Sequence, residues 1–509
     1  MMKVVLTGND LTVEEVWEIA VNGAEVEISP EADARLEASR KLVYELVDRN
    51  VSVYGFNTGV GWNKDHKIAK EFFEEFNRKL IYSHCLGVQP EASEQDVRAI
   101  MAIRLNTLLE GCTGIQPAIA RRYAEFLNAG IHPVMFERGS VGEADITQLS
   151  QIGLAMIGEG EVNYKGSRRP AAEAQKLAGL EPVTLGPKDG LAIVSSSAFS
   201  AGEAALAIKQ LDDLVDTGDI VYSVSLEGLN GNTSPLDPAV MEARKLPGQA
   251  KSAECVRKYI EGSDIYKPYP NKPVQDPLCF RGAAYVNGTL RDALEYAKKY
   301  LTIQMNSSDD NPCVVLKEKK IVSTSNFETT TFATAFELLG IVLSHISRMA
   351  CYRTIKLSNP ELTKLPRFLS HDDGQSHCFG TLQKTFTMLD TEIRHLSNPC
   401  SVDYMSLTGD IEDHANNTPL TVQHVRRIVE NLQYIYGLEL MHACQAVDLR
   451  LQRGGFKLGK GTRLAFEEFR RDVAFYKTDR PLAPDIQKAC DFIKSRKLIT
   501  NVKDVIIRQ

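Results

Sequence analysis

The chain lacks the features that mark several classes of protein. Its ten cysteines never occur at C-x-x-C spacing, so neither a zinc site nor a disulfide framework is indicated. It has no run of basic residues, and its formal net charge of −7 argues against a nucleic-acid-binding surface. We therefore expect no metal, and a small molecule rather than a nucleic acid as the ligand.

Signals for export and for membrane insertion are also missing. The first ten residues are mixed in character, unlike a signal peptide. The apolar run at residues 331–343 contains Glu337 and is shorter than the roughly 20 residues that cross a bilayer. These observations favour a protein of the cytoplasm, where cysteines stay reduced, with no membrane partner.

Long amphipathic stretches fill the later part of the chain. Apolar residues recur at helical spacing at 206–215, 332–343 and 422–435, and no sustained alternating pattern competes with them. Long antiparallel helices of this kind pack as a bundle. We predict a mainly α protein, with functional loops in residues 1–200, and a long-helix bundle and helical tail in residues 201–509, forming one continuous unit.

The segment Arg138–Ile146 is a glycine-containing loop that ends in two carboxylates, Glu143 and Asp145. Gly139 and Gly142 give it backbone freedom that other residues lack. Apolar residues at helical spacing follow, so the loop leads into a predicted helix. Taken alone, the two acidic side chains suit the free N–H groups at a helix start, which is a purely structural role.

Eight short motifs fall in order along the chain. They are Tyr54-Gly55-Phe56-Asn57-Thr58-Gly59-Val60-Gly61, Ser83-His84, Gly139-Ser140-Val141-Gly142, Ile157-Gly158-Glu159-Gly160-Glu161, Gln275-Asp276-Pro277, Asp310-Asn311-Pro312, Ser401-Val402-Asp403 and Glu412-Asp413-His414. In this order they resemble the histidine and phenylalanine ammonia-lyase family over nearly the whole chain. The resemblance implies an ammonia-lyase-like fold with a long central helical bundle, assembled as a homotetramer whose active sites are shared between subunits.

The acidic loop departs from that family. There, an Ala-Ser-Gly sequence cyclises into a methylidene-imidazolone, the electrophile that captures the substrate amine; here Glu143-Ala144-Asp145 takes its place. Cyclisation needs a serine that loses water and a small glycine after it, whereas Ser140 is followed by the bulkier Val141. Two supporting positions differ as well, since Ser195 replaces an asparagine and Leu278 a tyrosine. The sequence thus predicts the scaffold without its electrophile and without another cofactor.

The resemblance also assigns roles to single residues. Tyr54 would remove the β-proton of the substrate, although a phenol needs activation because its ordinary pKa is near 10. Arg281 would hold the substrate carboxylate through its bidentate fork. Lys384, where relatives are apolar, would act as an acid or stabilise negative charge on the ring, or would simply face solvent. The other expected pocket contacts are His84, Asn311, Phe327, Gln383 and Glu412.

Each of these residues also has an ordinary structural interpretation. Tyr54 could serve packing alone, and His84 could be an ordinary half-buried histidine. Asn311 could belong to a turn, Phe327 could be a core aromatic ring, and Arg281 could form a surface ion pair. Glu412 is the most informative, because the family glutamate at this place contacts the imidazole in histidine-specific members. Its retention favours an imidazole substrate over a phenyl one.

Without the electrophile, the predicted reaction is limited to substrates whose amine can leave without forming a covalent adduct. A primary ammonium leaves poorly and needs the adduct, whereas a quaternary ammonium cannot form one and departs as a neutral tertiary amine. Glu143 and Asp145 would face that permanent cation. At about 4 Å and an effective dielectric near 20, one such pair is worth on the order of 4 kcal/mol before desolvation. The sequence predicts a carbon–nitrogen lyase that acts on a betaine of histidine.

Two other functions remain open. One is a histidine or aromatic amino acid ammonia-lyase, or an aminomutase, with an unconventional electrophile. The other is an inactive relative that acts as a binding protein. Retention of Tyr54, Arg281 and Glu412 speaks against the second.

Overall fold

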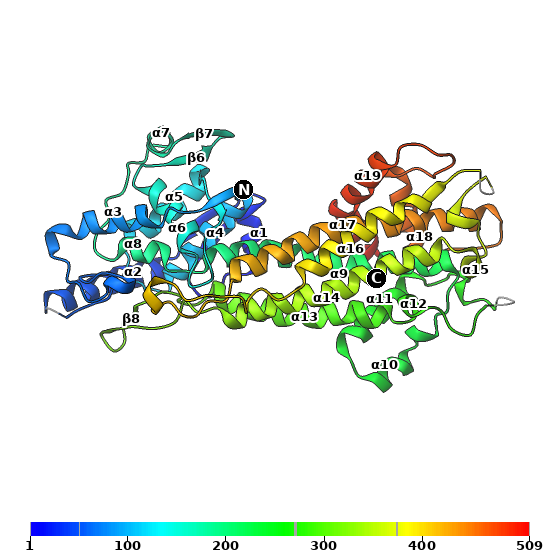
Figure 1. The fold of residues 1–509 in the computed structure, drawn as a ribbon, viewed down its shortest axis with the longest axis horizontal. Coiled ribbons are helices and arrows are strands. Elements are labelled where there is room, and N and C mark those ends of the chain that lie inside the picture. The colour runs from blue at the N-terminus through cyan, green and yellow to red at the C-terminus, as the bar shows by residue number, and fades with distance from the viewer. Residues whose placement is uncertain (1, 50, 269–271, 373–374, 508–509) are drawn as a thin grey trace. The chain divides into compact units, whose positions relative to one another are not determined.

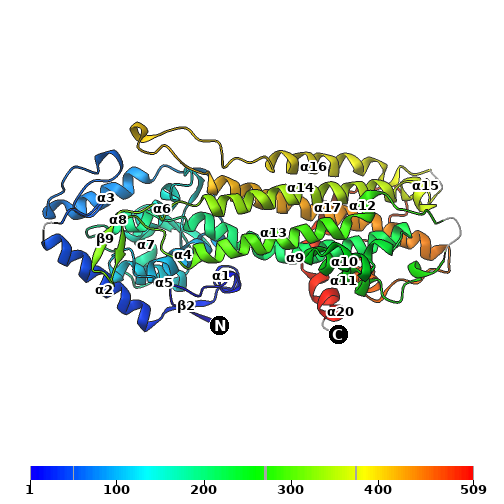
Figure 2. The same ribbon diagram turned by 90° about the horizontal axis from the view of Figure 1, so that it is seen from below.

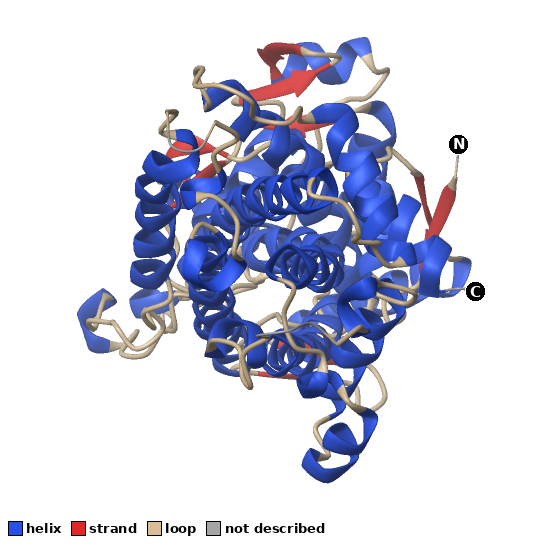
Figure 3. Ribbon diagram, turned by 90° about the vertical axis from the view of Figure 1, so that its right-hand side faces the viewer, coloured by secondary structure: helices blue, strands red, loops and turns tan. Residues whose placement is uncertain are grey.

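The computed structural model describes residues 2–49, 51–268, 272–372 and 375–507. Helices dominate these residues, and strands are short (Figure 3). The expected mainly α fold is confirmed. Two compact units are present: the first comprises residues 1–209, 297–337 and 399–423, and the second residues 210–296, 338–398 and 424–509. They differ from the expected consecutive regions 1–200 and 201–509, because two later segments return to the first unit.

The first unit begins with a group of short and medium helices (Figure 1). They are α1 Val13–Ala20, α2 Pro30–Asp48, α3 Phe73–His84, α4 Glu94–Leu109, α5 Pro117–Ala129, α6 Ile146–Met156, α7 Ala171–Leu177 and α8 Asp189–Val194. Capping boxes fix where two of them start: Thr12 with Glu15 at α1, and Ser93 with Asp96 at α4. Nearly every residue of α4 is buried, which makes it the core helix of this unit.

Short strands form small sheets within the described part of the first unit. The strands are β1 Lys3–Leu6, β2 Glu25–Ile28, β3 Val88–Glu91, β4 Ile131–Pro133, β5 Phe136–Arg138, β6 Glu161–Tyr164, β7 Ser167–Pro170, β8 Cys313–Val315 and β9 Lys320–Val322. β1 and β2 pair in parallel, whereas β3–β5, β4–β6–β7 and β8–β9 are antiparallel. β5 matters most for function, because the acidic loop leaves its end and runs into α6.

Four long helices contribute residues to both units. They are α9 Ala198–Leu229, α13 Ala283–Met305, α14 Thr330–Leu357 and α17 Thr418–Gln452, and they contain the three periodic stretches predicted from the sequence. In the second unit, buried ion pairs tie them together. Arg291 of α13 meets Asp219 of α9 at 2.6 Å, and Arg353 of α14 meets Glu439 of α17 at 2.6 Å. Such pairs strongly disfavour loss of either partner.

Shorter helices complete the second unit. They are α10 Pro238–Arg244, α11 Pro247–Tyr259, α12 Leu278–Arg281, α15 Pro360–Thr363, α16 Gln383–Leu396, α18 Lys460–Asp472, α19 Ala483–Lys494 and α20 Asp504–Ile507. Helix α16 runs alongside α14 (Figure 2), where the Ser347 hydroxyl donates to Asp390 at 2.7 Å. A glycine-containing segment with Gly454, Gly455 and Gly459 separates α17 from α18.

Within the residues that the structure describes, two helical segments are long and apolar enough to cross a bilayer by length and composition. The apolar window in residues 189–229 is wholly buried, and that in α14 is 56% buried. Helix α14, at Thr330–Leu357, extends well beyond the apolar run at 331–343. Buried core helices pass the same test, so this is weak evidence for a membrane span.

Candidate active site

The acidic loop has a backbone that few residues adopt. Gly142 has φ +91°, and a Cβ there would lie 2.3 Å from the Asn416 amide oxygen, so only glycine fits. Ala144 is also in the left-handed region, with φ +67°. Between them, Glu143 forms an isolated antiparallel bridge with Glu328. The loop therefore holds the Glu143 side chain at a defined place between β5 and α6.

Glu143 lies beside Tyr404, which comes from the segment between α16 and α17. The Tyr404 hydroxyl is 3.4 Å from a Glu143 carboxylate oxygen, and it donates to the backbone carbonyl of Glu412 at 2.8 Å. Burial raises the pKa of Glu143 to about 7, and the nearby charges of Glu412, Glu328 and Asp413 add to this, while the Tyr404 contact opposes it. The residue therefore changes charge near neutral pH.

Tyr54 belongs to the same group. Its phenolic oxygen accepts the Gly61 N–H at 2.9 Å, and a Cβ on Gly61 would lie 3.7 Å from the Glu412 carboxylate. The Thr408 hydroxyl donates to that carboxylate at 2.7 Å. Burial raises the pKa of Tyr54, Glu412 raises it further, and the Gly61 bond only partly offsets them. The phenol alone is thus a weaker acid than free tyrosine, and its activation as a base requires an added positive charge.

Asp145 behaves differently from Glu143. Its side chain is fully buried, and its carboxylate accepts the Ser200 backbone N–H at 2.8 Å and the Ser200 hydroxyl at 3.2 Å. Ser200 is in the first turn of α9, where backbone N–H groups lack helical partners. Burial raises the pKa of Asp145 to about 7. The residue is expected beside Glu143 at the ammonium; its carboxylate is bonded to the start of α9, and its contact with a ligand stays a prediction.

Three further expected pocket residues lie in the first unit with local hydrogen bonds or partial burial. His84 ends α3, with Nδ1 2.7 Å from the Leu80 carbonyl oxygen. Asn311 accepts the Thr324 N–H at 2.9 Å, and Phe327 is half-buried next to Glu328. Their contact with a ligand stays a prediction.

The remaining expected residues lie in the second unit. Arg281 is the last residue of α12 and is half-buried, and Gln383 is the first residue of α16. Lys384 follows it and is exposed. Leu278, at the start of α12, is 68% exposed. The roles given to these residues also stay predictions.

The residues present do not fit formation of an imidazolone. The Ser140 hydroxyl donates to Gln148 at 2.5 Å and caps the Thr147 N–H, so it is bound within the start of α6. Ser196, next to the altered Ser195 position, donates to Asp309 at 2.7 Å. These serines serve local structure, and the Glu-Ala-Asp sequence offers neither the dehydrating serine nor the glycine that ring closure needs.

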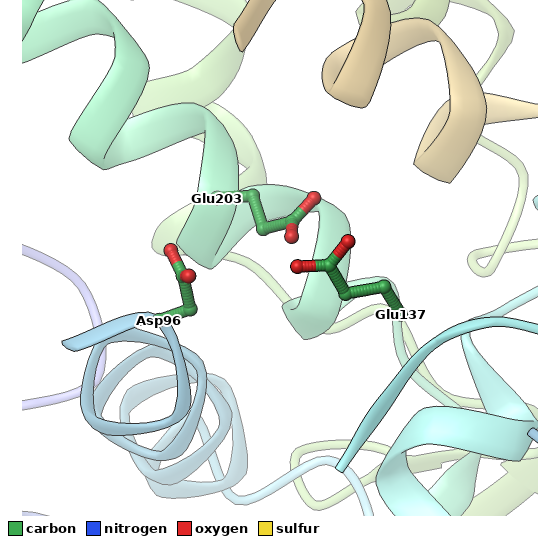
Figure 4. A group of neighbouring side chains, drawn as sticks. All are labelled: Asp96, Glu137 and Glu203. Atoms are coloured by element: carbon green, nitrogen blue, oxygen red, sulfur yellow. The ribbon is translucent and has the colours of Figure 1, made fainter. Parts of the chain in front are cut away.

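A separate acidic group lies elsewhere in the first unit. Asp96, Glu137 and Glu203 have carboxylate oxygens within 4.8 Å of one another (Figure 4). Asp96 already completes the α4 capping box with Ser93. We assign no metal to this group, because acidic clusters are common without one.

Tyr404 is the residue that the sequence reasoning missed. It directly follows the motif Ser401-Val402-Asp403, but the motif itself gives no sign that the tyrosine is functional. An aromatic residue placed eight positions before Glu412 gives no periodic signal, and only the folded segment brings its hydroxyl to Glu143.

Comparison with known proteins identifies clear relatives. A family model described as "Aromatic amino acid lyase" matches residues 11–471. Histidine ammonia-lyase of Alkaliphilus metalliredigens is 33% identical over 507 residues, covering 99% of both chains. The enzyme of the same name from Clostridium tetani is 34% identical, covering 99% of this chain and 98% of its own.

Solved structures also resemble the chain over nearly its whole length. A crystal structure of the ergothioneine-degrading enzyme ergothionase from Treponema denticola, in complex with desmethyl-ergothioneine sulfonic acid, has TM-score 0.94 and 46% identity. It covers 98% of this chain and 100% of its own. Histidine ammonia-lyase from Trypanosoma cruzi has TM-score 0.92 and 29% identity, covering 99% of this chain and 96% of its own.

Proposed function

Because this chain belongs to the aromatic amino acid lyase family, we propose that it is a carbon–nitrogen lyase that converts ergothioneine into thiourocanate and trimethylamine. Ergothioneine is the trimethylbetaine of a histidine whose ring carries sulfur. The observation that carries the proposal is the position of Glu143: an acidic side chain, beside Glu412 and Tyr404, at the place where the family electrophile forms. The 46% identity to ergothionase supports it.

The chemistry of the leaving group explains why no electrophile is needed. Removal of the β-proton leaves an electron pair that forms the new C=C bond, and the C–N bond electrons depart with trimethylamine. The product amine is neutral and needs no covalent activation. A catalyst for this elimination therefore needs a base, a group that stabilises charge on the ring and a surface that binds the cation.

The charges around Tyr54 and Glu143 suit a cationic substrate. Without ligand, burial first and then neighbouring carboxylates raise the pKa values of both residues. A quaternary ammonium between them would oppose the effect of the carboxylates, since an opposite charge within about 4–6 Å favours the ionised form. The substrate itself would thus help to make Glu143 anionic and Tyr54 a better base.

The remaining roles follow the family resemblance. Arg281 would hold the carboxylate, Lys384 would stabilise charge on the thioimidazole or donate a proton, and Gln383 would contact the ring. The other ring contacts would be His84, Asn311, Phe327 and Glu412. In a homotetramer with shared active sites, these side chains need not come from one copy of the chain.

A second candidate is histidine deamination, because the similar curated proteins named above are histidine ammonia-lyases. It would need an unconventional electrophile. The loop sequence Glu143-Ala144-Asp145 and the hydrogen bonds of Ser140 argue against it.

Incubation with ergothioneine, hercynine and histidine, followed by assay of trimethylamine and ammonia, separates these functions. We expect trimethylamine from ergothioneine and no ammonia from histidine. Hercynine, the sulfur-free betaine, shows whether the ring must be thiolated. Ammonia release from histidine alone would favour the second candidate, and no product from any substrate would favour an inactive binding protein.

We further propose that the enzyme uses no cofactor. Its intact-protein mass should then equal the mass calculated from the sequence. A mass lower by two waters would reveal an imidazolone and overturn this part of the proposal.

A further inference from the structure

Tyr404 is placed to act on the ligand as well as on the protein. It is half-buried, and its hydroxyl reaches both the Glu143 carboxylate and the Glu412 carbonyl. Burial and the adjacent carboxylates raise the pKa of Tyr404 to about 12, so the phenol stays neutral at physiological pH. Its single O–H proton is shared between the Glu412 carbonyl at 2.8 Å and the Glu143 carboxylate at 3.4 Å, and the residue brings an uncharged aromatic ring into contact with that carboxylate.

A quaternary ammonium is recognised by different groups from those that bind a primary ammonium. Its methyl groups cover the nitrogen, so it donates no N–H hydrogen bond and gains little from isolated acceptor oxygens. Aromatic faces attract it through the ring quadrupole, and a nearby carboxylate adds charge. Glu143 supplies that charge, and Tyr404 is the aromatic residue in hydrogen-bond contact with it.

We propose that Tyr404 is the residue that makes this site selective for a quaternary ammonium, with its ring against the methyl groups and its hydroxyl holding the Glu143 carboxylate in place. The proposal rests on the proposed function and names a specificity-determining residue for it. The Tyr404 hydroxyl also has a positioning role, because its bond to the Glu412 carbonyl fixes it within the segment between α16 and α17, and its contact with Glu143 joins that segment to the acidic loop.

The ring and the hydroxyl can be separated by substitution. Tyr404→Phe keeps the ring and loses both hydrogen bonds, whereas Tyr404→Met keeps a similar size and loses the ring. Tyr82→Met is a matched control, because the Tyr82 hydroxyl donates to Glu159 at 2.7 Å in the same kind of tyrosine–glutamate pair. Tyr404→Leu is a second ring-free variant, and a thermal melt of each protein identifies any that fails to fold.

Binding of simple cations tests the proposal without turnover. The full-length protein is titrated with tetramethylammonium and with methylammonium at pH 8.5, where Glu143 is ionised, and affinity is read from NMR broadening of their methyl signals. We expect both ring-free variants to weaken tetramethylammonium binding on the order of tenfold and to change methylammonium binding little. Tyr404→Phe should stay within about threefold of the wild type, and Tyr82→Met should match it.

The outcomes distinguish this inference from the proposed function. An equal loss for both cations in folded ring-free variants, or a loss in Tyr404→Phe as large as in Tyr404→Met, would overturn the selectivity role. Ergothioneine turnover by the wild type is measured in parallel. Normal turnover with no effect of Tyr404 on cation selectivity defeats the inference alone. Ring-dependent selectivity without trimethylamine release defeats the proposed function alone.

Discussion

Glu143 is half-buried, and its charge is only partly developed at neutral pH. Its pKa of about 7 arises from burial first and then from Glu412, Glu328 and Asp413, against the donating Tyr404 hydroxyl. A site for a permanent cation needs the carboxylate ionised. The affinity of the site is therefore linked to pH through this residue.

The first prediction follows from that linkage. Only ionised Glu143 attracts the ammonium, so betaine affinity should increase about tenfold between pH 6 and pH 8, as the carboxylate loses its proton. Titration calorimetry with a non-reacting betaine at several pH values measures it. Glu143→Gln should bind more weakly and lose this dependence; an unchanged pH profile in that variant would assign the titration to another group.

Tyr54 supports a second prediction. Tyr54→Phe removes the proposed base together with its bond from Gly61. Turnover should fall by roughly 10²–10⁴, while ligand affinity and melting temperature stay close to those of the wild type. Steady-state kinetics with ergothioneine and a thermal melt are the measurements. Near-normal turnover in a folded Tyr54→Phe protein would remove Tyr54 from the mechanism.

The acidic loop connects β5 to α6, but it also reaches a third element. Asp145 binds the first turn of α9, and the Asp145 N–H donates to the Ser196 carbonyl at 2.7 Å just before that helix. The two carboxylates of the loop therefore have different roles: Glu143 faces the group formed by Tyr404 and Glu412, and Asp145 stabilises the start of a long helix.

A third prediction separates these roles. Asp145→Ala leaves the Ser200 N–H without its acceptor and should lower the free energy of unfolding by about 1–3 kcal/mol, with betaine selectivity retained by the folded protein. Asp145→Asn, which keeps an acceptor oxygen, should cost less. Urea unfolding and betaine binding are the measurements. A selective loss of betaine binding in either folded variant would instead place Asp145 at the ligand.

The same residue has a defined effect on stability against pH. The folded-state pKa of about 7 lies above the ordinary value of 3.8, so the folded protein holds this proton more tightly than the unfolded chain. The stability from Asp145 is fully present below the unfolded pKa of 3.8 and is lost as pH rises from there through the folded pKa of about 7. Asp145→Asn should therefore lose less stability between about pH 4 and pH 7 than the wild type does.

Some elements of the fold could be predicted from the sequence, and others could not. Helices α9, α14 and α17 could be predicted because their apolar periodicity is long. The different surroundings of Glu143 and Asp145 could not be predicted. They depend on the left-handed Ala144 between them and on Ser200, which lies far along the chain.

At the scale of the whole molecule, helix α14 has an exposed apolar face that bears on how copies of the chain assemble. In the second unit, α14 leaves apolar residues exposed at helical spacing: Leu338 is 39%, Ile341 40% and Tyr352 50% exposed. The family resemblance implies a homotetramer, and an exposed apolar helix face is the kind of surface that such an assembly covers.

The last prediction tests that assembly. If the chain forms the proposed homotetramer through this face, Ile341→Glu should shift it to smaller species, because a carboxylate would be buried without a partner. Leu177→Glu, at an exposed apolar residue that ends α7, should leave the assembly intact. Light scattering after size exclusion measures both. A tetramer that survives Ile341→Glu would place the subunit contact elsewhere.

The attachment of Asp145 to α9 has a consequence for how this loop evolves. A return to the family sequence Ala-Ser-Gly would remove the acceptor of the Ser200 N–H and the Glu143 carboxylate before any ring could form. Under the proposed function, the changes at Glu143 and Asp145 along that route would weaken the cation site and the helix start, and none alone would restore deamination, because Ser195 and Leu278 also differ from the family sequence. We therefore expect stepwise mutation to retain this loop rather than to return it to the family sequence.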